Sequence, residues 1–314
     1  MKAVRFHEYG EPGVLRYEDV DQPVPGPGEV RVRVAATTFN GVDGNLRAGF
    51  MRGPMPLALP HIPGLDVAGT IDGLGEGAGE LQIGDRVVGF LPFVKDGASA
   101  EYVLAPAEIL APAPESIPLA DAAALPLVGL TAWQALFDHA GLKTGQRILI
   151  NGAGGAVGGY AVQLARAAGA HVIATGGPRS IERVRAAGAD EVIDHTATAV
   201  TAAVTEPVDV LLNLAPIEPA EYAALAGLVA DGGVVVGTTV WMPAPADEKR
   251  GVRGVDLYVR SDAGQLSELV ARVDRGALTV DVAERVLLAD LTSVHARAAE
   301  GTLPGKVIIL PATT

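Results

Sequence analysis

The sequence predicts an α/β protein that combines a doubly wound parallel sheet with a separate β-rich domain. An apolar run at Arg147–Ile150 leads into five glycines between Gly152 and Gly159, and a helical pattern follows. Strand and helix patterns alternate from there to about residue 260, as a parallel sheet requires. The first 120 residues instead carry short strands between many prolines and glycines, which is typical of a barrel-like domain.

Each part of the chain has its own periodicity. In the first part, apolar runs predict strands at Met1–Phe6, Val30–Val34, Val67–Ile71 and Asp85–Gly89. In the second part, helices are predicted over Tyr160–Ala168 and Ser180–Ala187, and strands at Arg147–Ile150, His171–Ala174, Glu191–Ile193, Val208–Leu212, Val234–Gly237 and Val255–Val259. The tail from Leu278 to Leu310 returns to strand, helix and strand, and we expect it to pack on the first domain.

Bulk properties exclude several classes of function. The 314 residues suffice for two domains, and a net charge of −13 argues against a nucleic-acid-binding surface. No apolar run reaches transmembrane length, and Met1–Phe6 lacks the apolar region of a signal peptide. We therefore expect a cytoplasmic protein with no membrane partner. The chain has no Cys, which excludes disulfides, cysteine-based catalysis and Cys-ligated zinc.

The turn Ala153-x-Gly155-x-x-Gly158 lies between a predicted strand and a predicted helix. Glycines in such a turn let the backbone approach a pyrophosphate, whose charge the helix N-terminus favours. A tight turn without a ligand is the alternative, but the strand before and the helix after are the context that dinucleotide binding needs. The sequence therefore predicts an enzyme that uses a nicotinamide cofactor.

Motifs along the whole chain resemble those of the medium-chain dehydrogenase/reductase superfamily, in its zinc-free quinone oxidoreductase branch. Besides the glycine turn, they are Met1-Lys-Ala-Val-Arg-Phe, Pro25-Gly-Pro-Gly-Glu-Val, Asn40-Gly-Val-Asp, Pro63-Gly-Leu-Asp-Val-Ala-Gly, Gly84-Asp-Arg-Val-Val-Gly, Ala100-Glu-Tyr-Val, Leu130-Thr-Ala-Trp, Gly188-Ala-Asp and Gly305-Lys-Val-Ile. The resemblance implies a GroES-like β-rich substrate domain in residues 1–120 and 277–314. It also implies a Rossmann domain for NADPH in residues 121–276 and an active cleft between the two.

The resemblance also bears on metal binding. Zinc-dependent members carry Cys where this chain has Asn40, and Gly-His-Glu where it has Gly64-Leu65-Asp66. Zinc prefers thiolate and imidazole ligands, which Asn40 and Leu65 do not provide. We therefore expect no metal site. Reduction of an electron-poor C=C bond needs less activation than oxidation of an alcohol.

The residues after the second Rossmann strand bear on the choice of cofactor. A carboxylate there would bind the ribose of NAD, but this chain has Thr175 followed by Gly176-Gly177-Pro178-Arg179. Arg179 or Arg183 could pair with the 2′-phosphate of NADPH, with His195 flanking it, although both arginines could also be solvated helix residues. We expect NADPH to be bound by the glycine turn and by the ends of the neighbouring strands, through Gly152, Ala153, Gly155, Ala156, Val157, Gly158, Thr175, Gly177, Arg179, Arg183, His195, Asn213, Leu214, Ala215, Thr238 and Thr239.

The resemblance places Asn40 and Asp43 near the nicotinamide end of the cleft, and Thr131, which opens a helix-like segment, is a third candidate that could bond the carboxamide or the substrate carbonyl. The Asn40 amide can donate to a substrate carbonyl or order the ribose. Two roles are open for Asp43, in the active site or as an anchor of its own loop, and two for Thr131, as a hydrogen-bond donor or as a helix cap. The proton donor is not assigned, because Phe50 stands where many relatives carry Tyr; Lys95, Thr131 and water are the alternatives.

These observations predict an NADPH-dependent reductase that transfers hydride to quinones or activated alkenes. A trans-acting enoyl reductase, a zinc-free alcohol dehydrogenase and a non-catalytic NADPH-binding redox sensor or structural protein are the alternatives. Relatives pair through the last Rossmann strand, here Val255–Val259, so we expect a homodimer with a continuous sheet.

Overall fold

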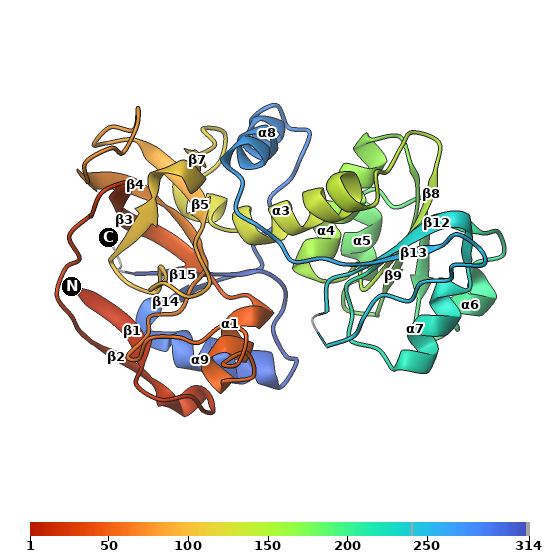
Figure 1. The fold of residues 1–314 in the computed structure, drawn as a ribbon, viewed down its shortest axis with the longest axis horizontal. Helices are drawn as coiled ribbons and strands as arrows, with labels where there is room; N and C mark the ends of the chain where they lie inside the picture. Colours follow the sequence, from red (N-terminus) through yellow and green to blue (C-terminus); the bar gives the residue numbers. More distant parts are fainter. Residues whose placement is uncertain (240, 312–314) are drawn as a thin grey trace. The chain divides into compact units, whose positions relative to one another are not determined.

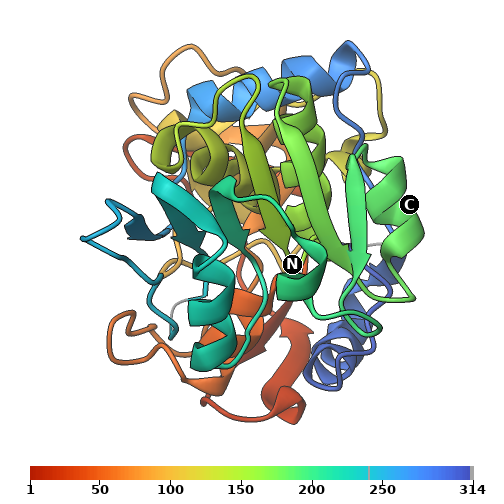
Figure 2. The same ribbon diagram turned by 90° about the vertical axis from the view of Figure 1, so that its right-hand side faces the viewer.

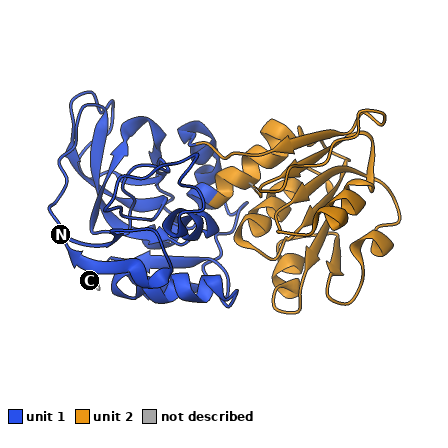
Figure 3. Cartoon of the chain, turned by 60° about the horizontal axis from the view of Figure 1, so that its bottom comes forward, with its two compact units in different colours: residues 1–127, 261–314 blue, residues 128–260 orange. Residues whose placement is uncertain are grey.

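The structure is a computed structural model that describes residues 1–239 and 241–311, and these residues form two compact units (Figure 3). Unit 1 comprises residues 1–127 and 261–314, and unit 2 comprises residues 128–260. The predicted Rossmann range, 121–276, is therefore wider than unit 2 at both ends. At the C-terminal end, the difference is that helix α8 (Ala263–Asp274) belongs to unit 1. The Asp274 carboxylate of this helix accepts from the backbone N–H groups of Glu115 and Ser116, at 2.9 Å each, within unit 1.

Unit 1 is built on a mixed sheet in which the long strand β3 (Glu29–Thr38) is central. The strand order is β14-β15-β3-β4-β5-β7, and β6 also pairs with β3. The bounds are β4 (Asp66–Leu74), β5 (Arg86–Phe90), β6 (Tyr102–Pro106), β7 (Leu110–Pro112), β14 (Glu284–Leu287) and β15 (Val307–Leu310), with β1 (Lys2–Phe6) and β2 (Leu15–Asp19) forming a separate antiparallel pair. In β15, Ile308 lies opposite Thr38 of β3, so the tail returns to the first domain as predicted.

Alternating side chains of β3 build the core of this unit. Val30 and Val32 are fully buried and pack in one cluster with Val67, Ile71 and Leu91. Half-exposed or exposed residues lie between them, which is the period-two pattern of a strand with one buried face. The helices of unit 1 are α1 (Gly41–Ala48), α2 (Leu119–Ala122), α8 and α9 (Leu291–Ala299), with single 3-10 turns at Pro12–Val14, Ala107–Ile109 and Leu288–Asp290.

Unit 2 contains a parallel sheet with the strand order β10-β9-β8-β11-β12-β13 (Figure 2). Its strands are β8 (Arg147–Asn151), β9 (His171–Gly176), β10 (Glu191–Asp194), β11 (Val208–Asn213), β12 (Val229–Gly237) and β13 (Arg253–Asp256). In chain order this is 3-2-1-4-5-6, the doubly wound arrangement that the sequence predicts. The order reverses between β8 and β11, and this switch point is where such sheets bind ligands.

Helices cover both faces of this sheet (Figure 1). Their bounds are α3 (Pro126–Trp133), which begins at the end of unit 1 and continues as a π-helical segment (Gln134–His139), α4 (Ala156–Ala167), α5 (Ile181–Ala186), α6 (Val200–Ala203) and α7 (Pro219–Ala226). On one face, Leu149, Leu211 and Val235 pack against Tyr222 and Leu225 of α7. Residues 148–150 of β8 and 210–212 of β11 are apolar and buried without a break, and successive strand residues point to opposite faces, so both faces of the sheet are apolar.

Several boundaries differ from the prediction, among them the start of one helix and the end of one strand. Helix α4 starts at Ala156 rather than at Tyr160, because Gly158 and Gly159 lie inside its first turns and do not interrupt it. The edge strand β13 ends at Asp256 rather than at Val259, and most of its residues are exposed. Pairing of two chains through this edge stays a prediction. Among the described residues, no helix has the length and apolar character of a membrane span.

Candidate active site and cofactor site

The glycine turn lies at the carboxyl end of β8, where its backbone is held by a neighbouring strand. Gly152 has φ of +82°, a left-handed conformation that favours glycine, and its N–H donates to the Thr175 hydroxyl at 2.8 Å. A Cβ at Gly152 would lie 3.0 Å from the Cβ of Ala215. The structure thus brings together three predicted cofactor residues that come from three different strand ends.

The first turn of α4 rests directly on this turn. Gly155 precedes the helix in an extended conformation, and Ala156, Val157 and Gly158 are its first residues. A Cβ at Gly158 would lie 2.4 Å from the backbone oxygen of Ala153, so the close approach of helix and turn requires glycine. The first N–H groups of a helix have no partner within it and point out of its N-terminus, where a pyrophosphate can accept them.

A buried ladder of polar side chains joins the ends of β8, β9 and β11. The Asn151 amide donates to Asn213 at 2.8 Å, and the Thr175 hydroxyl donates to Asn151 at 2.9 Å. The Asn213 amide donates to the carbonyl of Ala215 at 3.0 Å. Sequence reasoning found Thr175 and Asn213 but missed Asn151, whose signal was an amide at the end of an otherwise apolar strand.

The remaining residues expected at the strand ends lie at the same edge of the sheet. The N–H of Leu214 donates to the carbonyl of Asn151 at 2.9 Å, and the N–H of Thr238 donates to the carbonyl of Asn213 at 3.2 Å. Thr239 follows, and its carbonyl accepts from the N–H of Met242 at 3.1 Å. The residues predicted from the ends of β11 and β12 therefore converge with the glycine turn.

Beyond β9 the chain forms a polar corner next to the glycine turn. The Ser180 hydroxyl accepts from the N–H of Gly177 at 3.2 Å, and the Arg183 guanidinium donates to the carbonyl of Gly154 at 3.2 Å. His195 approaches from the other side, with Nε2 3.4 Å from where a Cβ of Gly177 would lie. Arg179 is exposed beside Ser180. The corner thus presents hydroxyl, imidazole and guanidinium groups, which suit a phosphate.

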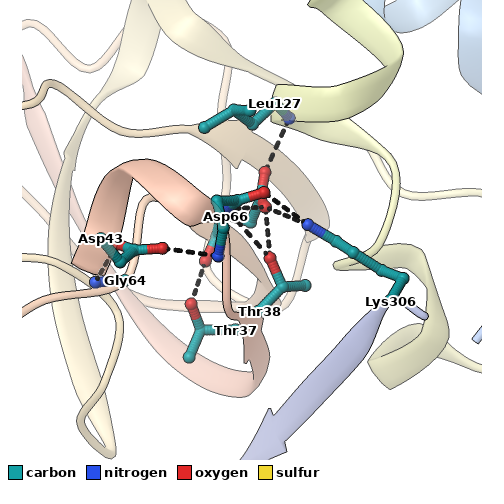
Figure 4. A network of polar contacts seen from close by, with 8 residues as sticks. Thr37, Thr38, Asp43, Gly64, Asp66, Leu127 and Lys306 are labelled. Atoms are coloured by element: carbon teal, nitrogen blue, oxygen red, sulfur yellow. Dashed lines mark hydrogen bonds and ion pairs between the residues drawn. The ribbon is translucent and has the colours of Figure 1, made fainter. Parts of the chain in front are cut away.

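A second polar cluster is buried in unit 1, with Asp66 as its hub (Figure 4). Asp66 is fully buried at the start of β4, and its Oδ1 accepts from the N–H of Leu127 at 2.7 Å. Its Oδ2 accepts from the Asn40 amide at 2.9 Å, from the Lys306 ammonium at 3.3 Å and from the Thr38 hydroxyl. Both oxygens of the carboxylate therefore accept hydrogen bonds.

The Asn40 amide is committed within this cluster. Its Nδ2 donates to Asp66 and, at 3.3 Å, to the Thr38 hydroxyl, and its Oδ1 accepts from Lys306 at 2.6 Å. The opposite orientation of the amide would place its oxygen against the Asp66 carboxylate and its NH2 against the ammonium. The group that we expected to meet a substrate carbonyl therefore has its hydrogens directed into unit 1. Sequence reasoning missed Lys306, which lies far from Asn40 along the chain.

Asp43 serves as an anchor, the second of its two open roles. Its Oδ2 accepts from the N–H of Asn40 at 2.8 Å, ahead of helix α1, and its Oδ1 accepts from the N–H of Gly64 at 3.2 Å. Arg47 does not pair with it, since that guanidinium donates to the carbonyl of Gly10. Burial raises the pKa of Asp43 to about 7, and the charge of Asp66 adds to this effect.

Stability should therefore depend on pH through Asp43. The pKa of Asp43 is raised from 3.8 to about 7 in the folded protein, so the folded state holds this proton more tightly than the unfolded state does. The stabilising contribution of Asp43 to the free energy of unfolding is therefore fully present below pH 3.8 and is lost as the pH rises through about 7. Asp43→Asn cannot titrate, so wild type should lose up to about 4 kcal/mol of unfolding free energy relative to this variant between about pH 4 and pH 8. Urea unfolding across this range, with the exposed Asp281→Asn as control, measures the difference. A difference that does not change with pH would contradict the assignment.

Thr131 lies in unit 2, in the interior of α3, and is buried. A helix cap stands at the end of a helix, so the cap role considered for Thr131 is wrong.

With respect to metals, no three His, Cys, Asp or Glu side chains of the described residues are grouped so that they could hold an ion.

Comparisons with known proteins agree with this organisation. A family model described as the alcohol dehydrogenase GroES-like domain matches residues 26–115, and one described as zinc-binding dehydrogenase matches residues 187–309. The chain is 35% identical over 328 residues to a chloroplast envelope quinone oxidoreductase homolog of Arabidopsis thaliana, covering 99% of this chain and 98% of that protein.

Solved structures of the same fold cover nearly the whole chain. One, described as an NAD-dependent alcohol dehydrogenase, has a TM-score of 0.90 and 29% identity and covers 99% of this chain and all (100%) of the other. A mycobacterial protein in complex with NADPH has a TM-score of 0.84 and 28% identity, with the same coverage of 99% and 100%. The glycine turn, the sheet order and the full-length likeness agree: the chain belongs to the quinone oxidoreductase branch of the medium-chain dehydrogenase/reductase superfamily.

Proposed function

We propose that the protein is an NADPH-dependent reductase that transfers hydride to quinones or to the β-carbon of enones, without zinc. The observation that carries the proposal is the corner beside the glycine turn, where Ser180, Arg183 and His195 gather and no carboxylate follows β9. The quinone oxidoreductases among its relatives and the NADPH complex of a similar structure support it.

The residues present fit the cofactor. At Gly152 and Gly158 a Cβ would press against atoms of Ala215 and Ala153, so these positions need glycine, as the turn of a pyrophosphate site does. The ends of β11 and β12, at Asn213 and Thr238, would line the nicotinamide half. When bound, NADPH supplies the hydride, and the protein contributes the binding, the orientation and the polarisation of the acceptor.

Substrate and metal are tested together. Purified protein should oxidise NADPH in the presence of members of a panel of quinones and enones, and a chelator should leave the rate unchanged. Oxidation of simple alcohols with NAD, abolished by the chelator, would instead favour an alcohol dehydrogenase, which the likeness to such an enzyme keeps as the second candidate. Binding of NADPH without turnover of any acceptor would indicate a non-catalytic protein.

The cofactor preference should depend on Arg179. NADPH should bind at least about tenfold more tightly than NADH, a difference of about 1.4 kcal/mol, and Arg179→Ala should erode this preference. Dissociation constants from fluorescence titration measure it. Arg185→Ala is the matched control. Arg185 lies in helix α5 and pairs with Glu182 of that helix at 2.6 Å. Equal constants for both cofactors in the wild type would refute the assignment.

The proposal extends to assembly. Most residues of the edge strand β13 are exposed, and we infer that two copies pair along it as a homodimer. Sedimentation velocity at micromolar concentration tests this, and a species near the chain mass of 32.1 kDa would count against it.

A further inference from the structure

Lys306 is an ammonium buried in a protein interior. It directly precedes β15, its side chain is 4% exposed, and its Nζ lies 2.6 Å from Oδ1 of Asn40 and 3.3 Å from Oδ2 of Asp66 (Figure 4). An ammonium has three N–H donors, and within the described part of the chain these two oxygens are its acceptors. One N–H is therefore left for a ligand or a water molecule.

The other donors of this cluster are committed. Both hydrogens of the Asn40 amide are directed to Asp66 and Thr38, and the Thr38 hydroxyl donates to Asp66. Asp43 and Asp66 are carboxylates whose oxygens accept from backbone and side-chain groups. A carbonyl oxygen that approaches this cluster would therefore find its donor at Lys306.

Such a buried cation costs free energy, which its pairing with Asp66 offsets only in part. Burial lowers the pKa of the Lys306 ammonium, while the charges of Asp66 and Asp43 raise it. An ammonium whose pKa is lowered releases its proton more readily and is a better general acid. Groups with shifted pKa values that lie in one polar cluster, as Lys306 and Asp43 do, are typical of functional sites.

We propose that Lys306 is the acid of the reductase reaction, donating its remaining N–H to the carbonyl oxygen of the substrate. This proposal rests on the proposed function. As hydride from NADPH forms the new C–H bond at the β-carbon of an enone, the C=C pair shifts and the carbonyl π electrons move onto oxygen. The oxygen takes the proton from Nζ to give an enol, which tautomerises to the saturated ketone. NADP⁺ and neutral Lys306 remain, and water reprotonates the amine.

Lys306 also provides the proton donor that was not assigned from the sequence, where Phe50 stands in place of the Tyr of many relatives. A phenyl ring cannot donate a proton, and Lys95, the other lysine considered, is exposed on a loop. The Lys306 side chain is instead held by Asp66 in a fixed position. A preorganised donor of this kind stabilises the negative charge that develops on oxygen.

The test compares Lys306→Met with wild type in steady-state and single-turnover kinetics on an enone. We expect kcat to fall about 100-fold or more, the range that general acid catalysis supplies. NADPH affinity should be unchanged, because the glycine turn belongs to unit 2. Lys143→Met, at an exposed lysine, is the control and should behave as wild type. Lys306→Arg keeps a cation but releases a proton far less readily, so it should also be slow.

Folding and pH provide readouts that a structural role would not move. Lys306→Met leaves Asp66 without its cation, so the double variant Asp66→Asn/Lys306→Met, which removes both charges, serves as the folded comparison by circular dichroism. The wild-type kcat should fall as the pH rises through the pKa of the ammonium. This descending limb of the pH profile should be absent in Lys306→Met and Lys306→Arg. Asp43 and Asp66 are the other titratable groups facing Nζ, and Asp43→Asn should keep the limb.

Two outcomes overturn the proposal in different ways. Turnover of the folded single or double variant within about threefold of wild type would show that Lys306 is not the acid, and would leave the proposed function intact. Absence of NADPH oxidation by the wild type with every enone and quinone tested would overturn the proposed function and this inference with it.

Discussion

Replacing Asp66 by alanine is expected to lower the free energy of unfolding by about 3 to 5 kcal/mol, the cost of leaving a buried charge without its partner. The Lys306 ammonium would lose its counter-ion, and the donors at Asn40 and Leu127 would lose their acceptor. Each unsatisfied buried donor adds to the loss. Urea unfolding followed by circular dichroism measures the change.

A matched control lies on the same strand. Asp72 of β4 pairs with Arg31 at 2.9 Å, but both side chains are partly exposed. Asp72→Ala should therefore cost about 1 kcal/mol or less. A similar loss of unfolding free energy in Asp66→Ala and Asp72→Ala would show that the buried Asp66 cluster stabilises the fold no more than an exposed ion pair does.

Substituting Gly158 by alanine should abolish tight binding of NADPH. The added methyl carbon would lie 2.4 Å from the Cα and from the backbone oxygen of Ala153, atoms that move only if helix α4 leaves the glycine turn. The helix N-terminus would then no longer face the pyrophosphate. We expect the dissociation constant to rise at least about 100-fold, or about 2.7 kcal/mol, in a fluorescence titration.

Gly159 provides the control for this change, one residue along the same helix. A Cβ there has no neighbour within 4 Å, so Gly159→Ala should bind NADPH as the wild type does. Alanine also favours helix over glycine, so the control should not lose stability. Unchanged NADPH affinity in Gly158→Ala would place the pyrophosphate elsewhere.

Much of the cofactor site could be predicted from the sequence, because its determinants are local. The glycines between Arg147–Ile150 and the following helix predict a tight turn, and the alternation of strands and helices predicts a parallel sheet. The same local reading placed Thr175, Asn213 and Thr238 at one edge, since parallel strands end together. It failed at the start of α4, where Gly158 and Gly159 resemble helix breakers but lie inside the helix, and of these two Gly158 packs closely against Ala153.

The buried cluster of unit 1 could not be predicted in this way. Asn40, Asp66 and Lys306 come from three segments that only the sheet brings together, where β15 pairs with β3. In the sequence, Lys306 opens an apolar strand and resembles an ordinary exposed lysine at a strand end. Asn40 was found through a resemblance, which gives a position but not the direction of its amide. The same limit applied to Asp43, whose anchoring role depends on the distant Gly64.

Direct transfer of hydride from NADPH to a substrate carbon can be followed with an isotope label. NADPH deuterated at both C4 positions is oxidised by the protein in the presence of an enone, and the product is analysed by mass spectrometry and NMR. Direct transfer should place deuterium on the β-carbon of the saturated ketone and a proton from solvent at the α-carbon. Consumption of NADPH that leaves no deuterium bound to carbon in the product, or no consumption with any enone or quinone, would contradict it.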